Sequence, residues 1–187
     1  MLLGLFVFAV FSLPVARIMA QAPGKKNLRP PGVTPAIEAS IKKGLAYLVR
    51  AQEPNGSYGK STWSTNIYPT AISSLAGLAF LASGSTPTRG PYARNLQKIT
   101  SYLLNNCVGT YSYAPGLLAN SNAREQRPMY CHAFAMTYLS QIFAQEKDPR
   151  QREVIRKVLQ DAVKLTQRSQ TREGGWGYSP NAYEDEG

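Results

Sequence analysis

Hydrophobic residues recur with a helical period in three separate parts of the chain. Within residues 37–48, Ile and Leu side chains follow one another at spacings of four, four and three residues. Side chains at these spacings lie on one side of an α-helix. The same pattern returns in residues 96–103 and 154–163. The sequence therefore predicts three amphipathic helices, each of which buries one side.

Two other segments are apolar on nearly every side. Residues 68–82 read YPTAISSLAGLAFLA and residues 129–144 read MYCHAFAMTYLSQIFA, and neither contains a formally charged side chain. Helices of this composition are buried on all sides, and both segments are shorter than a membrane span. The chain alternates between amphipathic and apolar segments, which predicts five α-helices without a β-sheet core.

The amphipathic segments end in similar turns. A glutamine is followed, four and six residues later, by a glycine and an aromatic residue, at Gln52, Gly56 and Tyr58 in the first copy and at Gln170, Gly174, Gly175 and Trp176 in the last. Between them, Cys107 replaces the glutamine and Gly109 precedes an aromatic residue. Glycine can end a helix in a conformation closed to other residues, while the aromatic ring packs beneath the turn. The glutamine amide can bond free backbone groups at a neighbouring helix end, so we expect these residues to be structural.

Alternating amphipathic and apolar helices can bury their apolar surfaces in a double layer of helical hairpins, with the apolar helices inside. The Gln-x-x-x-Gly-Gly-Trp segment at residues 170–176 resembles the QW motif of squalene/oxidosqualene cyclases and protein prenyltransferase β-subunits. Residues 47–58 resemble the same motif with Tyr in place of Trp. The resemblance extends over residues 36–187 and implies an all-α fold, a partial α/α toroid corresponding to the N-terminal portion of the family domain. An open solenoid is the alternative.

The first residues are typical of an export signal. Residues 1–16 form an uncharged apolar run, small residues follow around Gln21, and the chain then becomes polar. This layout predicts a signal peptide at residues 1–22 and a periplasmic or extracellular protein, with an uncleaved membrane anchor as the alternative. Residues 23–35 are rich in Pro, Gly and Lys, which predicts a linker to the repeat domain.

The formal net charge is +10, and much of the basic excess lies in residues 147–172, where eight basic residues accompany three acidic ones. Such a face can contact an anionic membrane surface, although a solvated helix surface is the simpler interpretation. The basic residues are not interleaved with aromatic ones, as in a nucleic-acid stacking surface, so we expect no nucleic-acid partner. The sequence contains no P-loop, dinucleotide fingerprint or Ser-His-Asp pattern, and we expect no cofactor.

The segment Glu184-Asp185-Glu186 contains the candidate catalytic residues. The resemblance places it near the start of a third inner helix, where squalene cyclases carry an Asp-x-Asp-Asp motif whose acid protonates the substrate. Crowded carboxyl groups in an apolar cavity repel one another, and one of them keeps its proton near neutral pH. Asp185 is the candidate acid, with Glu184 and Glu186 as helpers. The segment departs from the family motif, and helix capping is the alternative role.

Tyr68 and Tyr130 stand at the starts of the two apolar segments, where we expect them to occupy equivalent positions. Aromatic faces stabilise carbocations, so the resemblance makes both residues candidates to line a cavity for an isoprenoid or another apolar small molecule. Cys107, Cys131 and His132 form a weaker candidate set for zinc, as in lanthipeptide-cyclase toroids. A core cysteine beside a hydrogen-bonded histidine is the alternative interpretation.

The resemblance leads to the hypothesis of an exported prenyltransferase-like or squalene-cyclase-like repeat protein, with acid-initiated cyclisation as its candidate chemistry. A second hypothesis, from another class, is a non-catalytic helical scaffold that binds a protein or a glycan. A third is a zinc-dependent toroid enzyme. All three share the same predicted helical architecture, so they differ only in what the cavity and the exposed faces do.

Overall fold

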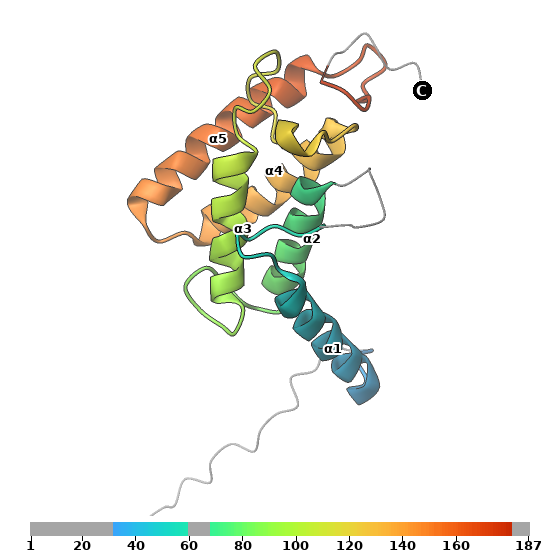
Figure 1. The fold of residues 1–187 in the computed structure, drawn as a ribbon, viewed down its shortest axis with the longest axis vertical. Helices are drawn as coiled ribbons and strands as arrows, with labels where there is room; N and C mark the ends of the chain where they lie inside the picture. Colours follow the sequence, from blue (N-terminus) through green and yellow to red (C-terminus); the bar gives the residue numbers. More distant parts are fainter. Residues whose placement is uncertain (1–31, 60–67, 181–187) are drawn as a thin grey trace, which may run out of the picture.

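The computed structural model describes residues 32–59 and 68–180. Five α-helices and one short 3-10 helix make up these residues (Figure 1): α1 (Pro35–Ala51), α2 (Pro69–Ala82), α3 (Ala93–Asn106), η1 (Ser121–Ala123), α4 (Pro128–Gln145) and α5 (Pro149–Arg168). Within the same ranges, β-type pairing is limited to two isolated bridges. The predicted all-α class with five α-helices is therefore confirmed for the part of the chain that is described.

Several predicted features lie outside the described residues. These are the signal peptide, most of the Pro-rich linker and the acidic segment Glu184-Asp185-Glu186. Among the helices that the structure does describe, none combines the length and the apolar character needed to cross a membrane.

Local sequence signals explain where the helices begin. Proline occupies the first turn of α1, α2, α4 and α5, where its missing N–H has no helical partner to lose. The Thr34 hydroxyl accepts a hydrogen bond from the Ile37 N–H at 3.3 Å, and the Asp148 carboxylate accepts one from the Arg150 N–H at 2.9 Å. Side-chain acceptors at this position satisfy N–H groups that the helix leaves free.

The two uncharged helices, α2 and α4, pack against each other and form the centre of the molecule. Nine of the 14 residues of α2 are buried, whereas only Leu45 is buried among the 17 residues of α1. Gly77 of α2 permits the close approach, because a Cβ atom there would overlap the ring of Tyr138 on α4. The Tyr138 hydroxyl lies 3.0 Å from the Thr100 hydroxyl and 2.9 Å from the Leu96 carbonyl oxygen of α3. This tyrosine therefore links both central helices to α3.

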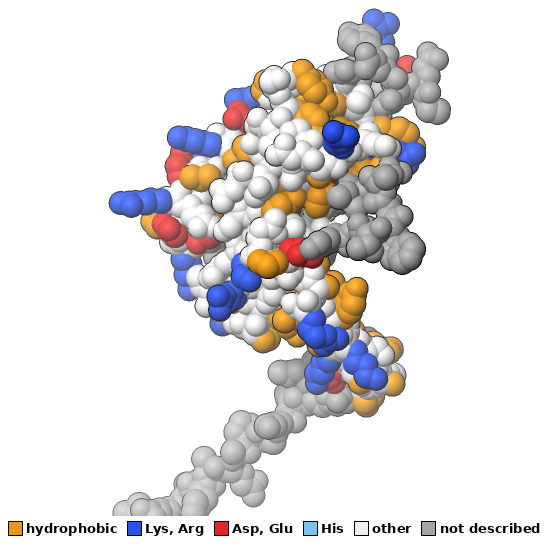
Figure 2. Space-filling view, in the orientation of Figure 1, with side chains coloured by type: hydrophobic (Ala, Val, Ile, Leu, Met, Phe, Trp, Pro, Cys, Tyr) orange, Lys and Arg blue, Asp and Glu red, His pale blue; other side chains and the backbone are white. Residues whose placement is uncertain are grey.

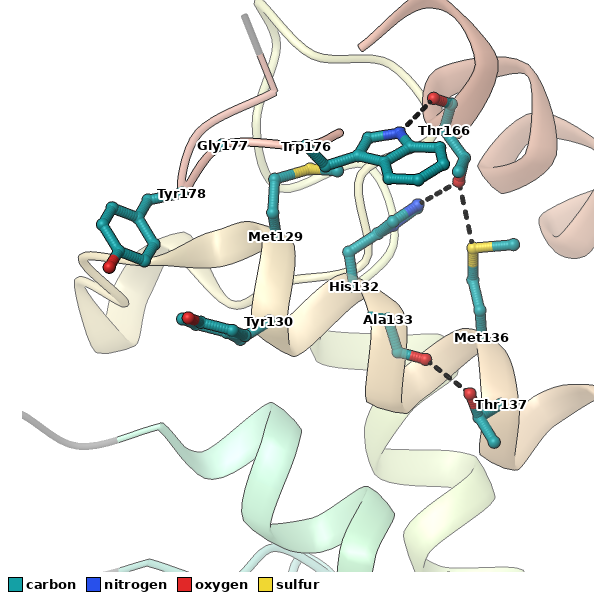
Figure 3. A pocket seen from close by; sticks show the side chains of 10 residues that line it. All are labelled: Met129, Tyr130, His132, Ala133, Met136, Thr137, Thr166, Trp176, Gly177 and Tyr178. Atoms are coloured by element: carbon teal, nitrogen blue, oxygen red, sulfur yellow. Dashed lines mark hydrogen bonds between the residues drawn. The ribbon is translucent and has the colours of Figure 1, made fainter. Parts of the chain in front are cut away.

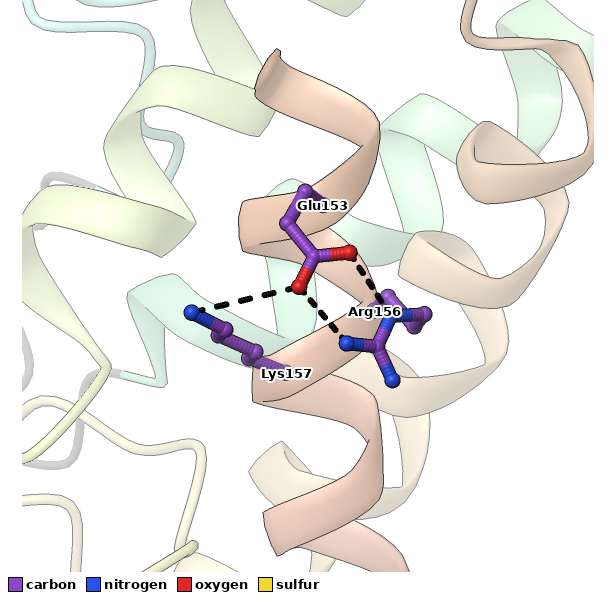
Figure 4. Close-up of polar contacts among 3 residues, drawn as sticks. All are labelled: Glu153, Arg156 and Lys157. Atoms are coloured by element: carbon purple, nitrogen blue, oxygen red, sulfur yellow. Dashed lines mark hydrogen bonds and ion pairs between the residues drawn. The ribbon is translucent and has the colours of Figure 1, made fainter. Parts of the chain in front are cut away.

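The three amphipathic helices surround this centre. The contacts of α3 are mainly with α2 and those of α5 mainly with α4, while α1 touches the end of α2 and projects from the body (Figure 1). On the solvent side of α5, Glu153 accepts hydrogen bonds from Arg156 and lies 3.9 Å from the Lys157 ammonium (Figure 4). Exposed ion pairs of this kind contribute little to stability, so α5 is held by its buried side.

The loops after α1 and α3 dock on the next amphipathic helix in the same way. A Cβ atom at Gly56 would overlap the Lys98 carbonyl of α3, and one at Gly116 would overlap the Asp161 carbonyl of α5. Two residues further on, the Tyr58 N–H donates to the Ser73 hydroxyl and the Leu118 N–H donates to His132 Nδ1. The two loops therefore make matching contacts with the helices that follow them.

The middle copy of this repeat differs from the sequence expectation. We expected Gly109 to correspond to Gly56, but a Cβ atom at Gly109 would have no described neighbour within 4 Å. The loop after α3 is closed by a bridge between Val108 and Leu118, and Gly116, which lies between these two residues, contacts α5. The extra loop residues displace the docking glycine along the sequence, which is why a fixed spacing from the helix end did not find it.

The apolar helices also define their own register. Pro69 opens α2 and Pro128 opens α4, an offset of 59 residues. At this offset Tyr68, which precedes α2, corresponds to Arg127 rather than to Tyr130. The expectation that the two tyrosines occupy equivalent helix starts is therefore wrong by three positions, and they face different surroundings.

Candidate functional site

The turn after α5 forms one wall of the candidate site. The Gln170 side-chain amide donates to the Gly174 carbonyl oxygen at 2.8 Å, and the Trp176 indole N–H donates to the Thr166 carbonyl oxygen at 2.7 Å. The Thr171 N–H closes the turn onto the Gly175 carbonyl oxygen at 2.9 Å. These bonds hold the indole ring over the last turn of α5.

Gly174, rather than Gly175, is the counterpart of Gly56. Both glycines have a positive φ, +94° for Gly56 and +87° for Gly174, and both accept the bond from the glutamine four residues earlier. A Cβ atom at Gly174 would meet only the Gln170 amide, at 3.8 Å. Among the described residues, nothing else therefore lies against the outer side of this turn, and Trp176 is 50% exposed.

An apolar pocket of about 450 Å³ lies between this turn, α4 and the end of α5 (Figure 3). Trp176 covers His132, while Met136 and Thr166 close one end and Tyr130 and Tyr178 lie at the other. Tyr130 thus lines a pocket, which is the role for which it was a candidate. Tyr68 does not line this pocket, because it packs against the buried cluster that contains Ala71 and Cys131.

His132 is the only histidine of the chain, and its polar atoms are already bonded. Its Nδ1 accepts the Leu118 N–H at 3.1 Å, and its Nε2 lies 3.0 Å from the Thr166 hydroxyl. Burial lowers the pKa of His132 to about 4, so the ring is neutral at physiological pH. The Nδ1 atom is an acceptor, which places the proton on Nε2 and makes Thr166 its acceptor. The ring therefore offers little further polar contact to a ligand.

The opposite end of the pocket is aromatic and bordered by a cation. The rings of Tyr130 and Tyr178 lie 5.6 Å apart, and the Arg127 guanidinium lies 4.5 Å from the Tyr178 ring centre. The Met129 N–H donates to the Tyr178 carbonyl oxygen at 3.1 Å, which fixes the turn to the start of α4. Both tyrosines are about half exposed, so this end is the mouth of the pocket.

The weaker zinc candidates are not brought together. The Cys107 thiol lies 3.1 Å from the Thr70 hydroxyl, and burial raises its pKa to about 12. Burial also raises the pKa of the Cys131 thiol, which lies in the cluster at the start of α2. His132 points instead toward Thr166. Across residues 32–59 and 68–180, no group of three or more His, Cys, Asp or Glu side chains is placed to hold a metal ion.

Glu125 is a buried carboxylate that sequence reasoning missed. One of its oxygens accepts the Thr70 N–H and the other accepts the Asn120 N–H, both at 2.8 Å. The first contact caps α2 and the second fixes the loop before η1. A sequence signal for it exists, because the pattern Asn-Ala-x-Glu at residues 122–125 recurs at residues 181–184. Glu184 therefore has a counterpart whose carboxylate caps a helix.

The lining of the pocket beside Trp176 is mainly apolar. The residues that line the pocket include aromatic rings, two methionines and an alanine, and none of them carries a carboxyl group. No family model, no curated protein and no solved structure matches this chain.

Proposed function

We propose that this chain is an exported helical-repeat protein of the squalene-cyclase and prenyltransferase type, which binds an isoprenoid or a similar apolar molecule in the pocket beside Trp176. The observation that carries the proposal is the lining of that pocket. Trp176, Met129, Met136 and Tyr130 supply apolar surface, and the hydroxyl of Thr137 is used by its own helix. A hydrocarbon ligand fits such a lining because it leaves no buried polar group without a partner.

The repeat supports the toroid part of the proposal. Two successive loops dock through a glycine on the next amphipathic helix, and the two apolar helices pack against each other. Repetition of one such step generates a curved double layer. An acid-initiated cyclisation would in addition need a carboxylic acid facing the ligand, for which Asp185 stays the candidate predicted from the sequence.

The tryptophan in the pocket provides a direct test. The chain has two tryptophans, so a Trp63→Phe background assigns the fluorescence to Trp176. We expect titration with farnesol or geranylgeraniol to shift this emission saturably, because the ligand displaces water from the indole. Ala133→Phe, which fills the pocket, should weaken binding about tenfold. Ala144→Phe, an exposed change on the same helix outside the pocket lining, is the matched control.

Two results would count against a ligand site in this pocket. The first is the absence of a saturable change with either alcohol. The second is equal binding by the wild type and Ala133→Phe, which would move the ligand to another surface.

A second candidate function, a protein-binding scaffold, is favoured by the exposed side of α4. Tyr130, Ala133 and Thr137 lie exposed on one stripe of this helix. At the 59-residue offset, their counterparts on α2 are Ala71, Ser74 and Leu78, of which the first two are buried. The stripe that α2 uses to pack inside the molecule is therefore free on α4, as expected for a surface that receives another helix.

A further inference from the structure

The mouth of the pocket beside Trp176 differs from its interior in charge. None of the ten lining residues is charged at neutral pH, since His132 is neutral. At the mouth, the Arg127 guanidinium lies 4.5 Å from the ring centre of Tyr178, which lines the pocket. Figure 2 shows basic side chains beside hydrophobic ones at the end of the molecule where α4 begins. An apolar interior with a cation at its opening suits an amphiphile, whose polar head stays in water.

The guanidinium of Arg127 has donors to offer an anion. Its contact with the Tyr178 ring gives none of its five N–H groups an oxygen acceptor. Across residues 32–59 and 68–180, the ion pairs are formed by other basic residues, and no carboxylate pairs with Arg127. The side chain is therefore positioned by an aromatic ring, while its charge is not balanced by a described residue.

The place of Arg127 in α4 also favours an anion. Arg127 is the N-cap residue of α4, and the first turn of this helix contains no acidic residue. The positive end of the helix dipole disfavours a cation and favours an anion at this position. At the start of α2, the Glu125 carboxylate accepts the Thr70 N–H. The corresponding N–H of α4, on Met129, donates to the Tyr178 carbonyl oxygen instead, so no carboxylate of the described residues caps this end.

We infer that the pocket beside Trp176 takes a long-chain carboxylate, with the chain inside the pocket and the carboxylate bound to Arg127. The inference rests on the proposed function and specifies the head group of the ligand. A carboxylate carries one negative charge, which one arginine balances, and its two oxygens match the fork of a guanidinium. A phosphate ester carries more charge than this mouth offsets, and a neutral alcohol offsets none of the charge of Arg127.

Paired titrations measure the head-group preference. Farnesoic acid and farnesol share one chain and differ in the head group, and both are followed by the Trp176 emission in the Trp63→Phe background. At pH 7 the acid is ionised. We expect it to bind at least about fivefold more tightly than the alcohol at low salt. The ratio of the two affinities should shrink as salt is added, because an exposed charge pair is screened.

Two arginine variants assign this preference to a residue. Arg127→Gln removes the cation and should reduce the acid-to-alcohol ratio to about one, whereas Arg127→Lys should keep part of it. Arg152→Gln is the matched control, because Arg152 is also exposed and also lies over an aromatic ring, that of Phe143, which does not line the pocket. This control should keep the wild-type ratio.

The outcomes separate the head group from the ligand site. Equal affinities for the acid and the alcohol in the wild type would overturn the inference and leave the ligand site in place. A ratio that survives Arg127→Gln would also overturn it, as would a ratio that Arg152→Gln abolishes equally. The absence of a saturable change with either compound would contradict the proposed ligand site, and the inference would fall with it.

Discussion

The turn after α1 and the turn after α5 are built by matching hydrogen bonds but have different surroundings. In each, a glutamine amide donates to a glycine carbonyl four residues later, and an aromatic side chain donates to a carbonyl oxygen ten residues earlier. The first turn also rests on α3, where Gln52 exchanges two hydrogen bonds with Asn95. Tyr58 is consequently 3% exposed, against 50% for Trp176.

This difference separates what the local sequence determines from what a neighbour determines. The turn geometry needs only the glutamine, the glycine and the aromatic donor, because it forms equally well where the turn is open. Burial needs a second helix against the glycine. A motif of this type therefore specifies a docking surface, and its exposure shows whether the surface has been used.

The largest contrast is expected for the two glycines. Gly56→Ala forces a side chain onto a positive φ and into the Lys98 carbonyl, and it should lower the free energy of unfolding by more than about 3 kcal/mol. Gly174→Ala places a side chain on a positive φ without a steric overlap, and it should lower the free energy of unfolding by about 1 kcal/mol. Urea denaturation of both variants measures the difference. Equal losses would mean that the docking of Gly56 on α3 contributes nothing beyond the turn itself.

The aromatic donors should give a smaller contrast of the same sign. Tyr58→Phe removes the hydroxyl that donates to the Leu48 carbonyl oxygen at 2.8 Å in a buried site, and should cost about 1–2 kcal/mol. Trp176→Phe removes the hydrogen bond from the indole N–H to the Thr166 carbonyl oxygen at a half-exposed site. Water can bond that carbonyl instead, so the free energy of unfolding should fall by only about 0.5 kcal/mol. Both values come from the same denaturation experiment. A larger loss for Trp176→Phe would show that its turn is covered in solution.

The helices could be predicted from sequence because their signals are local. The predicted segment 68–82 begins one residue before the observed α2 and ends with it. The predicted segment 129–144 is one residue shorter than the observed α4 at each end. The docking glycine of the middle repeat could not be predicted, because Gly116 is defined by its approach to α5 rather than by its distance from a helix end. Trp176 was expected to be buried, and its exposure depends on a neighbour that the motif does not contain.

The candidate site was harder to predict for a similar reason. Tyr130 was selected by an incorrect correspondence with Tyr68, yet it does line the pocket. Glu125 was missed because a buried carboxylate is recognised by the N–H groups it accepts, and these come from Thr70 and Asn120, which are distant in sequence. Contacts between loops leave no periodic pattern, so only the recurrence of Asn-Ala-x-Glu could have indicated them.

The two docked loops should also differ in their response to pH. The Tyr58 N–H donates to a serine, Ser73, which does not titrate, whereas the Leu118 N–H donates to His132. The folded pKa of His132, about 4, lies below its usual value near 6.5, so the unfolded chain binds the proton more tightly. The contribution of neutral His132 to the free energy of unfolding is fully present above pH 6.5. It falls by about 2–3 kcal/mol as the pH decreases toward 4.

Denaturation at a series of pH values between 7 and 4 measures this loss. His132→Gln removes the titrating group, and its stability should change less over the same range than that of the wild type. Ser73→Ala provides the comparison with the first loop, because it should lower stability by the same amount at every pH. Equal pH dependence in the wild type and His132→Gln would assign the acid sensitivity to other groups.

The smallest effect is expected on the solvent side of α5, where neither turn makes contact. The Glu153 carboxylate accepts hydrogen bonds from Arg156, which lower its pKa, with Lys157 nearby (Figure 4). A depressed folded pKa makes the contribution present above the unfolded pKa and lost as the pH falls through the acid range. The pair is exposed to water and salt, which screen it, so Glu153→Gln should leave the urea midpoint at pH 7 unchanged within error. A shift as large as that of Tyr58→Phe would mean that α5 depends on its charged side, and that the buried contacts of the turns do not dominate the repeat.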